Sequence, residues 1–171
     1  SSLAAFYFRE DRQSLFWAWA VQAAAIDSAN LETLFRMAHL VSQSSREIPS
    51  QLKLESQGAL NSYLMFLLRE GSLENVANVA EKLDFTAPHI ELLLNACDRL
   101  LDAGRPADAV RIWNRLGVHG GAAFTRLQPL HGIMLVNGTF RPAPMRGFNW
   151  RSNKTPEVTV KMREPSGFRV E

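Results

Sequence analysis

The residues that could take part in chemistry are few and widely spaced. The chain holds four histidines, which are His39, His89, His119 and His131. None of them is paired as HxxxH or HExxH, so the i, i+4 geometry of a helical zinc site is missing. The single cysteine, Cys97, falls on the apolar side of a predicted helix, where a thiol lacks the electropositive and accessible surroundings of a nucleophile. The sequence therefore predicts no metal and no other cofactor.

Other catalytic signatures are also missing from the sequence. No GxSxG motif occurs, and the GVHGG segment lacks the Lys and the Ser or Thr that a phosphate-cradling loop requires. The acid pair Glu10 and Asp11 lies on a predicted helix surface, and no second carboxylate is spaced to face it for acid/base work. We therefore expect a protein that is not an enzyme.

Composition and charge are those of a globular chain with a basic tail. Hydrophobic residues make up 46% and charged residues 21% of the 171 residues, which argues against extensive disorder. Residues 1–125 hold 11 basic and 14 acidic side chains, whereas residues 126–171 hold 8 and 3. The tail interleaves Arg and aromatic residues, but a β core needs the same rings, so nucleic acid is not the expected partner. No run reaches the roughly 18 to 20 apolar residues of a membrane span.

Apolar periodicity is the main structural signal in residues 1–125. A helix is predicted to begin at Pro88 and end at Gly104, with one apolar stripe formed by Ile90, Leu93, Leu94, Cys97, Leu100 and Leu101. A second helix is predicted to follow and to stop at Gly117. Its buried side is expected to consist of Ala109, Ile112, Trp113 and Leu116.

A related pattern occurs earlier in the chain. Residues 67–83, LLREGSLENVANVAEKL, align without a gap with residues 100–116, LLDAGRPADAVRIWNRL, which places Gly71 over Gly104. A longer helix is predicted from about Leu3 to Ile26, and the SSREIPSQ stretch is predicted to be a loop. The sequence therefore predicts three helix-turn-helix units, at about 3–43, 51–84 and 88–117. Such units stack into an α-α superhelix because one hairpin cannot bury its apolar face alone.

This pattern resembles the tetratricopeptide repeat family, whose unit is a helical pair of similar length. The residues that carry the resemblance are Gly71, Ala77, Ala80, Gly104, Ala109, Trp17 and Ala20. The Pro that usually ends each unit is absent, so a generic α-α superhelix is the alternative. The apolar run YLMFLL, residues 63–68, favours a helix covered by its neighbours over an open apolar groove for a peptide.

The resemblance implies a non-catalytic scaffold for protein–protein interaction. A protein or peptide partner would lie on the inner face, against polar side chains on the first helix of each pair. The positions expected to make these contacts are Asn61, Ser62, Asn95 and Arg99.

Beyond residue 125 the helical pattern gives way to short segments of β character. The runs IMLV, GFNW, VTVKM and GFRV are separated by Gly and Pro. A few short strands with open edges have too little face to bury. We therefore expect residues 126–171 to form a β-rich tail, which is either the beginning of a truncated β-sandwich domain or a small appendage packed on the last helices.

The tail resembles the opening strands of a jelly roll of the carbohydrate-binding-module type. The residues that carry this resemblance are Asn137, Gly138, Phe140, Gly147, Phe148 and Trp150. It implies an alternative function, a helical spacer plus a partial glycan-binding module in a bacterial cell-envelope polysaccharide or secretion system. Trp150 and Arg151 would then contact a glycan or an anion, and the compartment would be the periplasm or cell envelope. Arg141 replaces an acidic residue that often holds calcium in such modules, which argues against calcium here.

Overall fold

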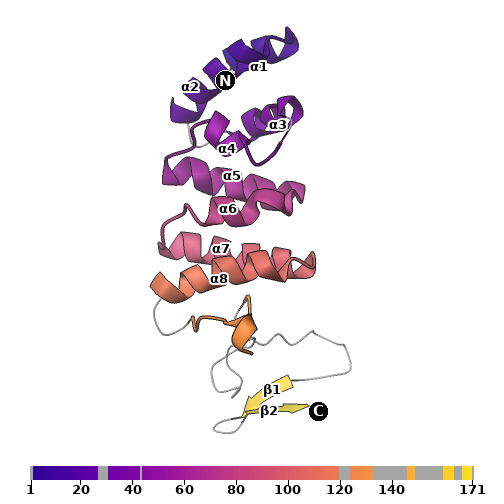
Figure 1. Cartoon of the computed structure of the whole chain (residues 1–171), viewed down its shortest axis with the longest axis vertical. Coiled ribbons are helices and arrows are strands. Elements are labelled where there is room, and N and C mark those ends of the chain that lie inside the picture. Colours follow the sequence, from indigo (N-terminus) through magenta and orange to yellow (C-terminus); the bar gives the residue numbers. More distant parts are fainter. Residues whose placement is uncertain are drawn as a thin grey trace. The chain divides into compact units, whose positions relative to one another are not determined.

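A computed structural model gives the structure of residues 2–26, 31–42, 44–119, 124–132, 146–148, 160–163 and 167–170. The chain is mainly helical, as the sequence predicts, with eight α-helices among these residues (Figure 1). It divides into two compact units, Ser1–His89 and Ile90–Glu171, and each is described by itself.

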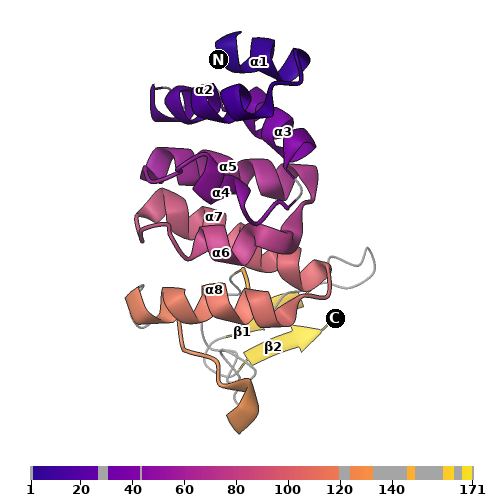
Figure 2. The same cartoon turned by 45° about the horizontal axis from the view of Figure 1, so that its top comes forward.

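The first unit consists of short and medium-length helices. They are α1 (Ser2–Arg9), α2 (Gln13–Ile26), α3 (Glu32–Val41), α4 (Ile48–Gln51), α5 (Gln57–Glu70), the 3-10 turn η1 (Leu73–Asn75) and α6 (Val76–Ala80). α1 lies beside α2, and α6 lies beside α5 (Figure 2). α3 packs on α5, and the two are also joined at the surface by an ion pair between Arg69 Nη2 and Glu32 Oε2 at 2.6 Å.

The prediction of one long helix from about Leu3 to Ile26 is wrong. The chain reverses after Arg9, and Asp11 adopts a left-handed backbone conformation with φ of 53°, which Asp tolerates better than most residues. The reversal lets Ala4 of α1 pack in the core with Phe16 and Ala20 of α2. The described residues of the predicted unit 3–43 therefore belong to three helices and not to one hairpin, because four consecutive charged residues interrupt the apolar pattern.

The prediction of a loop for the SSREIPSQ stretch is also wrong, because this stretch contains α4. Pro49 lies in the first turn of this helix, where its missing N–H is no loss. Ile48 and Leu52 are fully buried, so tertiary packing stabilises a helix of a single turn.

α5 is the central helix of the first unit. It begins after Ser56, whose side chain accepts a hydrogen bond from the backbone N–H of Ala59 at 3.2 Å, and it ends at Gly71 with φ of 72°. Tyr63, Leu64 and Leu67 are fully buried. The YLMFLL run is therefore covered by its neighbours, except at Met65, which exposes 54% of its surface.

The second unit contains the predicted final pair of helices. α7 (Ala87–Asp102) begins in the first unit and continues into the second, and α8 (Pro106–His119) follows after Gly104 with φ of 69°. The burial predicted for α8 is confirmed, since Ala109, Ile112, Trp113 and Leu116 are all buried. On α7, Leu93, Leu94, Cys97 and Leu100 are buried as predicted, and Ile90 and Leu101 are partly exposed.

The prediction that Gly117 ends this helix is wrong, since α8 continues to His119. Gly117 instead allows another segment of the chain to pass close to α8. A Cβ at position 117 would lie 2.7 Å from the carbonyl oxygen of Phe124, in the segment that folds back on α8.

The described parts of the tail are short. A 3-10 turn, η3, covers Pro129–His131, and strands β1 (Val160–Arg163) and β2 (Gly167–Val170) pair antiparallel with Val160 opposite Val170 and Met162 opposite Phe168. Most of residues 133–159 lie outside the described residues. The larger β-rich tail over 126–171 and the jelly-roll resemblance therefore stay predictions.

Candidate functional site

The predicted partner contacts lie on two helices in different units. Asn61 and Ser62 are partly exposed on α5, and the amide nitrogen Nδ2 of Asn61 lies 3.6 Å from the sulfur of Met65. Asn95 and Arg99 are exposed one turn apart on α7. The structure thus brings the members of each pair together, and their role in binding stays a prediction. Trp150 and Arg151 lie outside the described residues.

The structure has an uncharged surface on α2, and the sequence did not predict a site there. The helix carries no charged residue, and after its first two residues its exposed side consists of Leu15, Ala18, Trp19, Gln22, Ala25 and Ile26. These positions recur at i, i+3, i+4 and i+7, so they form one continuous side, here named the α2 apolar face. Leu15 exposes 37% of its surface, Trp19 40% and Ile26 84%. The sequence signal is a helix without charged residues that carries large apolar side chains on more than one side, of which only one side can be buried by α1.

A buried polar network lies elsewhere in the first unit. Nε2 of His39 on α3 is 3.0 Å from the hydroxyl of Tyr63 on α5, and this hydroxyl lies 3.5 Å from the carbonyl oxygen of Ser45. The same carbonyl accepts a hydrogen bond from Nδ2 of Asn75 at 3.2 Å. Oδ1 of Asn75 in turn accepts from Nδ2 of Asn78 at 3.0 Å. Asn75 is only 2% exposed, so the network joins α3 and α5 to the start of α6 through a satisfied buried amide.

Burial perturbs two groups of this network. The loss of solvation lowers the pKa of His39, and the negative charge of Glu70 opposes this effect. Burial also raises the pKa of Tyr63 far above its usual value, although a hydrogen bond with Asn75 acts in the opposite direction. Both groups are therefore neutral near pH 7, which suits a network held by hydrogen bonds between uncharged partners.

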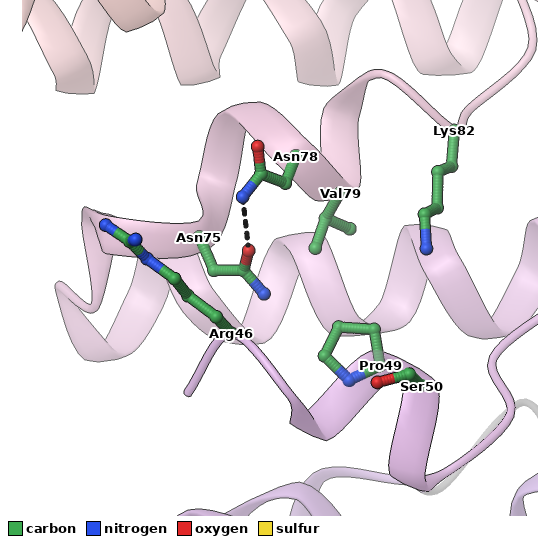
Figure 3. A pocket seen from close by; sticks show the side chains of 7 residues that line it. All are labelled: Arg46, Pro49, Ser50, Asn75, Asn78, Val79 and Lys82. Carbon is green, nitrogen blue, oxygen red and sulfur yellow. Dashed lines mark hydrogen bonds between the residues drawn. The ribbon is translucent and has the colours of Figure 1, made fainter. Parts of the chain in front are cut away.

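The network ends at a small polar hollow between α4 and α6 (Figure 3). Its volume is about 90 Å³, and its lining consists of Arg46, Pro49, Ser50, Asn75, Asn78, Val79 and Lys82. Two of these side chains are cationic and none is acidic. Figure 3 shows Asn78, Val79 and Lys82 on one wall, opposite Pro49 and Ser50.

The two cations of the hollow differ in their partners. Nε of Arg46 lies 3.1 Å from Oε1 of Glu74, with both side chains more than half exposed. Lys82 makes no ion pair with any residue in the described part of the chain. Asn75, Asn78 and Lys82 follow one another at i, i+3 and i+7, which is a weak sequence signal for a shared side. Nothing in the sequence pairs them with Arg46.

A third feature, in the second unit, is the attachment of a tail segment to α7 and α8. The backbone N–H of Gly147 donates to Oδ1 of Asp98 at 2.8 Å. The rings of Phe148 and Trp113 form a T-shaped pair with centroids 5.7 Å apart, and the indole N–H of Trp113 donates to the carbonyl oxygen of Thr125 at 2.8 Å. Gly147 and Phe148 therefore serve to anchor the tail on the helices.

Within the described residues, no group of three or more His, Cys, Asp or Glu side chains is placed to hold a metal ion. The described helices include none that is both long and apolar enough to cross a membrane. Comparison of the chain with protein-family models, with curated proteins and with solved structures finds no match. Exposure, charge and hydrogen bonding in the chain itself are therefore the basis for a function.

Proposed function

We propose that this chain is a non-catalytic protein–protein interaction scaffold of tetratricopeptide-repeat type that binds a protein partner through the α2 apolar face. The observation that carries the proposal is the exposure of Leu15, Trp19 and Ile26 on one side of a helix without charge. An exposed apolar side of this kind is typical of a surface that a partner covers.

The spacing of the face indicates the shape of the partner. From Leu15 to Ile26 the face extends over roughly 16 Å of helix, at 1.5 Å per residue. A straight apolar ridge of this length is complementary to one side of an amphipathic helix, which presents its own anchors at i, i+3, i+4 and i+7. The proposed partner element is therefore a helix with one apolar side.

The energy available from this face is moderate. Full burial of one large apolar side chain contributes about 1.5–3 kcal/mol. Leu15 and Trp19 are already more than half covered in the free chain. The three anchors together therefore contribute less binding free energy than three fully exposed side chains would. A micromolar complex requires about 8 kcal/mol, so polar side chains around the face have to contribute the remainder. Trp19 is the expected hot spot, since Trp is enriched among residues that dominate binding.

Equivalent positions in the two aligned segments support the repeat type. Gly71 and Gly104 are 33 positions apart and both have φ near 70°. The residues that the alignment pairs are buried in both segments, at Leu67 and Leu100, Val76 and Ala109, Val79 and Ile112, and Leu83 and Leu116. This correspondence supports a repeated helical hairpin as the structural unit.

The test compares the proteins that bind to this chain in its native cell when the α2 apolar face is intact and when it is disrupted. Tagged wild type, Trp19→Glu and Leu40→Glu would be purified and their bound proteins quantified by mass spectrometry. Leu40 is the matched control, because it is a large apolar residue on α3 that is 72% exposed and lies outside the face. We expect Trp19→Glu to lose a specific partner that Leu40→Glu retains, and the purified partner to bind Trp19→Glu at least about tenfold more weakly. An identical set of bound proteins for all three would contradict the proposal.

A further inference from the structure

We propose that the hollow between α4 and α6 binds a phosphoryl group, either as free phosphate or as a phosphate ester. The lining of the hollow includes the cationic side chains of Arg46 and Lys82, which lie at its two ends in Figure 3, and it includes no carboxylate. This site lies on other helices than the α2 apolar face and requires an anionic ligand. The inference therefore goes beyond the scaffold function and does not depend on it.

The number of N–H donors favours a phosphoryl group over a carboxylate. A phosphate monoester carries about −1.5 to −2 charges near pH 7 and has three strong acceptor oxygens. Glu74 already balances the charge of Arg46, but the guanidinium and ammonium groups together present more N–H donors than the two oxygens of a carboxylate can accept, whereas three phosphoryl oxygens can use them. Lys82 has no acidic partner in the described part of the chain, so a ligand would supply its counter-charge.

Arg46 can engage a ligand and keep its existing partner. Its Nε lies 3.1 Å from Oε1 of Glu74, and a guanidinium group has five N–H donors, more than one carboxylate needs. Its terminal nitrogens are suited to hold phosphate oxygens, since the planar fork matches the geometry of two oxygens on one phosphorus. Glu74 would then act as a positioning residue for Arg46.

The rest of the wall is held in place before any ligand arrives. The buried amide of Asn75 fixes the amide of Asn78 through the hydrogen bond of 3.0 Å. The backbone around Lys82 is tied to α5 by Gln57, whose Nε2 donates to the carbonyl oxygen of Lys82 at 3.2 Å and whose Oε1 accepts from the N–H of Asp84 at 2.9 Å. Donors that are oriented in advance bind an anion without a large loss of conformational entropy.

Size limits the ligand to a compact group. A volume of about 90 Å³ holds several water molecules and accommodates a tetrahedral oxyanion, but not a nucleoside. The side chains of Pro49 and Val79 line part of the space and exclude water there, which strengthens the attraction between an anion and the two cations. If the phosphate belongs to an ester, the remainder of the ligand has to lie outside the hollow.

The experiment measures binding of defined probes to the 171-residue chain by isothermal titration calorimetry at about pH 7.5 and low salt, where exposed cations are least screened. The probes are inorganic phosphate, O-phospho-L-serine and acetate. The variant is Lys82→Gln, and its matched control is Lys53→Gln, which removes the same charge from an exposed lysine that does not line the hollow. We expect Lys82→Gln to weaken phosphate binding by about tenfold, the effect of losing one charge-assisted hydrogen bond. Lys53→Gln is expected to bind as the wild type does.

A second variant tests the wall itself. Asn78→Asp keeps the size of the side chain and places a negative charge beside the ligand, so it is expected to abolish phosphate binding while circular dichroism shows an unchanged helical content. Tighter binding of phosphate than of phosphoserine assigns the site to free phosphate, and the reverse order assigns it to an ester. The proposal is overturned if neither probe binds, if acetate binds as tightly as phosphate, or if Lys53→Gln and Lys82→Gln weaken binding equally.

Discussion

The indole ring of Trp113 leaves no room for a side chain at Gly147. A Cβ at position 147 would lie 2.6 Å from Cζ3 of Trp113, and the φ of Gly147 is 76°, a conformation that other residues rarely adopt. Trp113 is fully buried and its indole N–H is bonded to Thr125, so the ring cannot move aside without breaking other contacts. The anchoring of the tail on α7 and α8 therefore requires a glycine at this position.

The first prediction concerns Gly147→Ala. The left-handed conformation costs about 1–2 kcal/mol for a residue with a Cβ, and the clash with Trp113 adds about 1–3 kcal/mol. We expect one of two results. Either segment 146–148 detaches, which proteolysis at this segment would detect, or the free energy of unfolding falls by the sum of these two costs. The matched control is Gly132→Ala, because Gly132 has φ of 77° and a Cβ at this position would have no atom within 4 Å. Equal losses of stability for the two variants would show that the clash contributes nothing.

The second prediction concerns the buried amide of Asn75. Asn75→Asp replaces the Nδ2 donor by an oxygen that faces the carbonyl oxygen of Ser45, and it places a charge at a site that is 2% exposed. We expect the free energy of unfolding to fall by about 3 kcal/mol or more, because a buried charge without a partner is strongly unfavourable. The same change at Asn95, which is exposed on α7, should cost less than about 1 kcal/mol. Urea denaturation of both variants measures the difference, and similar losses would contradict the role assigned to Asn75.

The third prediction concerns the pH dependence that His39 produces. Burial lowers its pKa in the folded chain, so the unfolded chain binds more protons as the pH falls through the ordinary histidine range. Stability is therefore fully present above a pH of about 6.5 and decreases below it, down to the folded pKa. We expect His39→Gln, which keeps a polar group near Tyr63, to lose less stability than the wild type between about pH 7.5 and pH 5, a range that spans the ordinary histidine pKa. Thermal unfolding of both proteins across this range measures the difference. Parallel stability profiles would rule out His39 as the cause of the pH dependence.

The fourth prediction compares two helix ends. Gly71 and Gly104 have φ of 72° and 69°, and neither has any atom within 4 Å of the place of a Cβ. Substitution by Ala should therefore cost only the left-handed conformation, about 1–2 kcal/mol at each position. Chemical denaturation of the two variants should give equal losses if the two hairpins are equivalent. A loss at one position that is several times larger would argue against equivalent turns.

Much of the helical architecture can be predicted because it depends on local patterns. The apolar spacing along α8 and the positive-φ glycines after α5 and α7 follow from short-range rules that hold wherever the segment packs. Such rules do not predict the break between α1 and α2, since a run of charged residues is compatible both with an exposed helical turn and with a reversal of the chain. Local rules do not predict α4 either, because a single turn has no periodicity of its own and only the burial of Ile48 and Leu52 makes it stable.

The sequence by itself determined that the chain is mainly helical, where the last two helices place their apolar sides, and that glycines follow α5 and α7. Tertiary structure alone decided which side of α2 stays exposed, which tail residues anchor on Trp113, and that Arg46 and Lys82 line one hollow. The physical reason is the range of the interactions. Helix formation and capping depend on residues within a turn or two, whereas a surface or a binding site depends on packing between residues far apart in the chain, which no local pattern encodes.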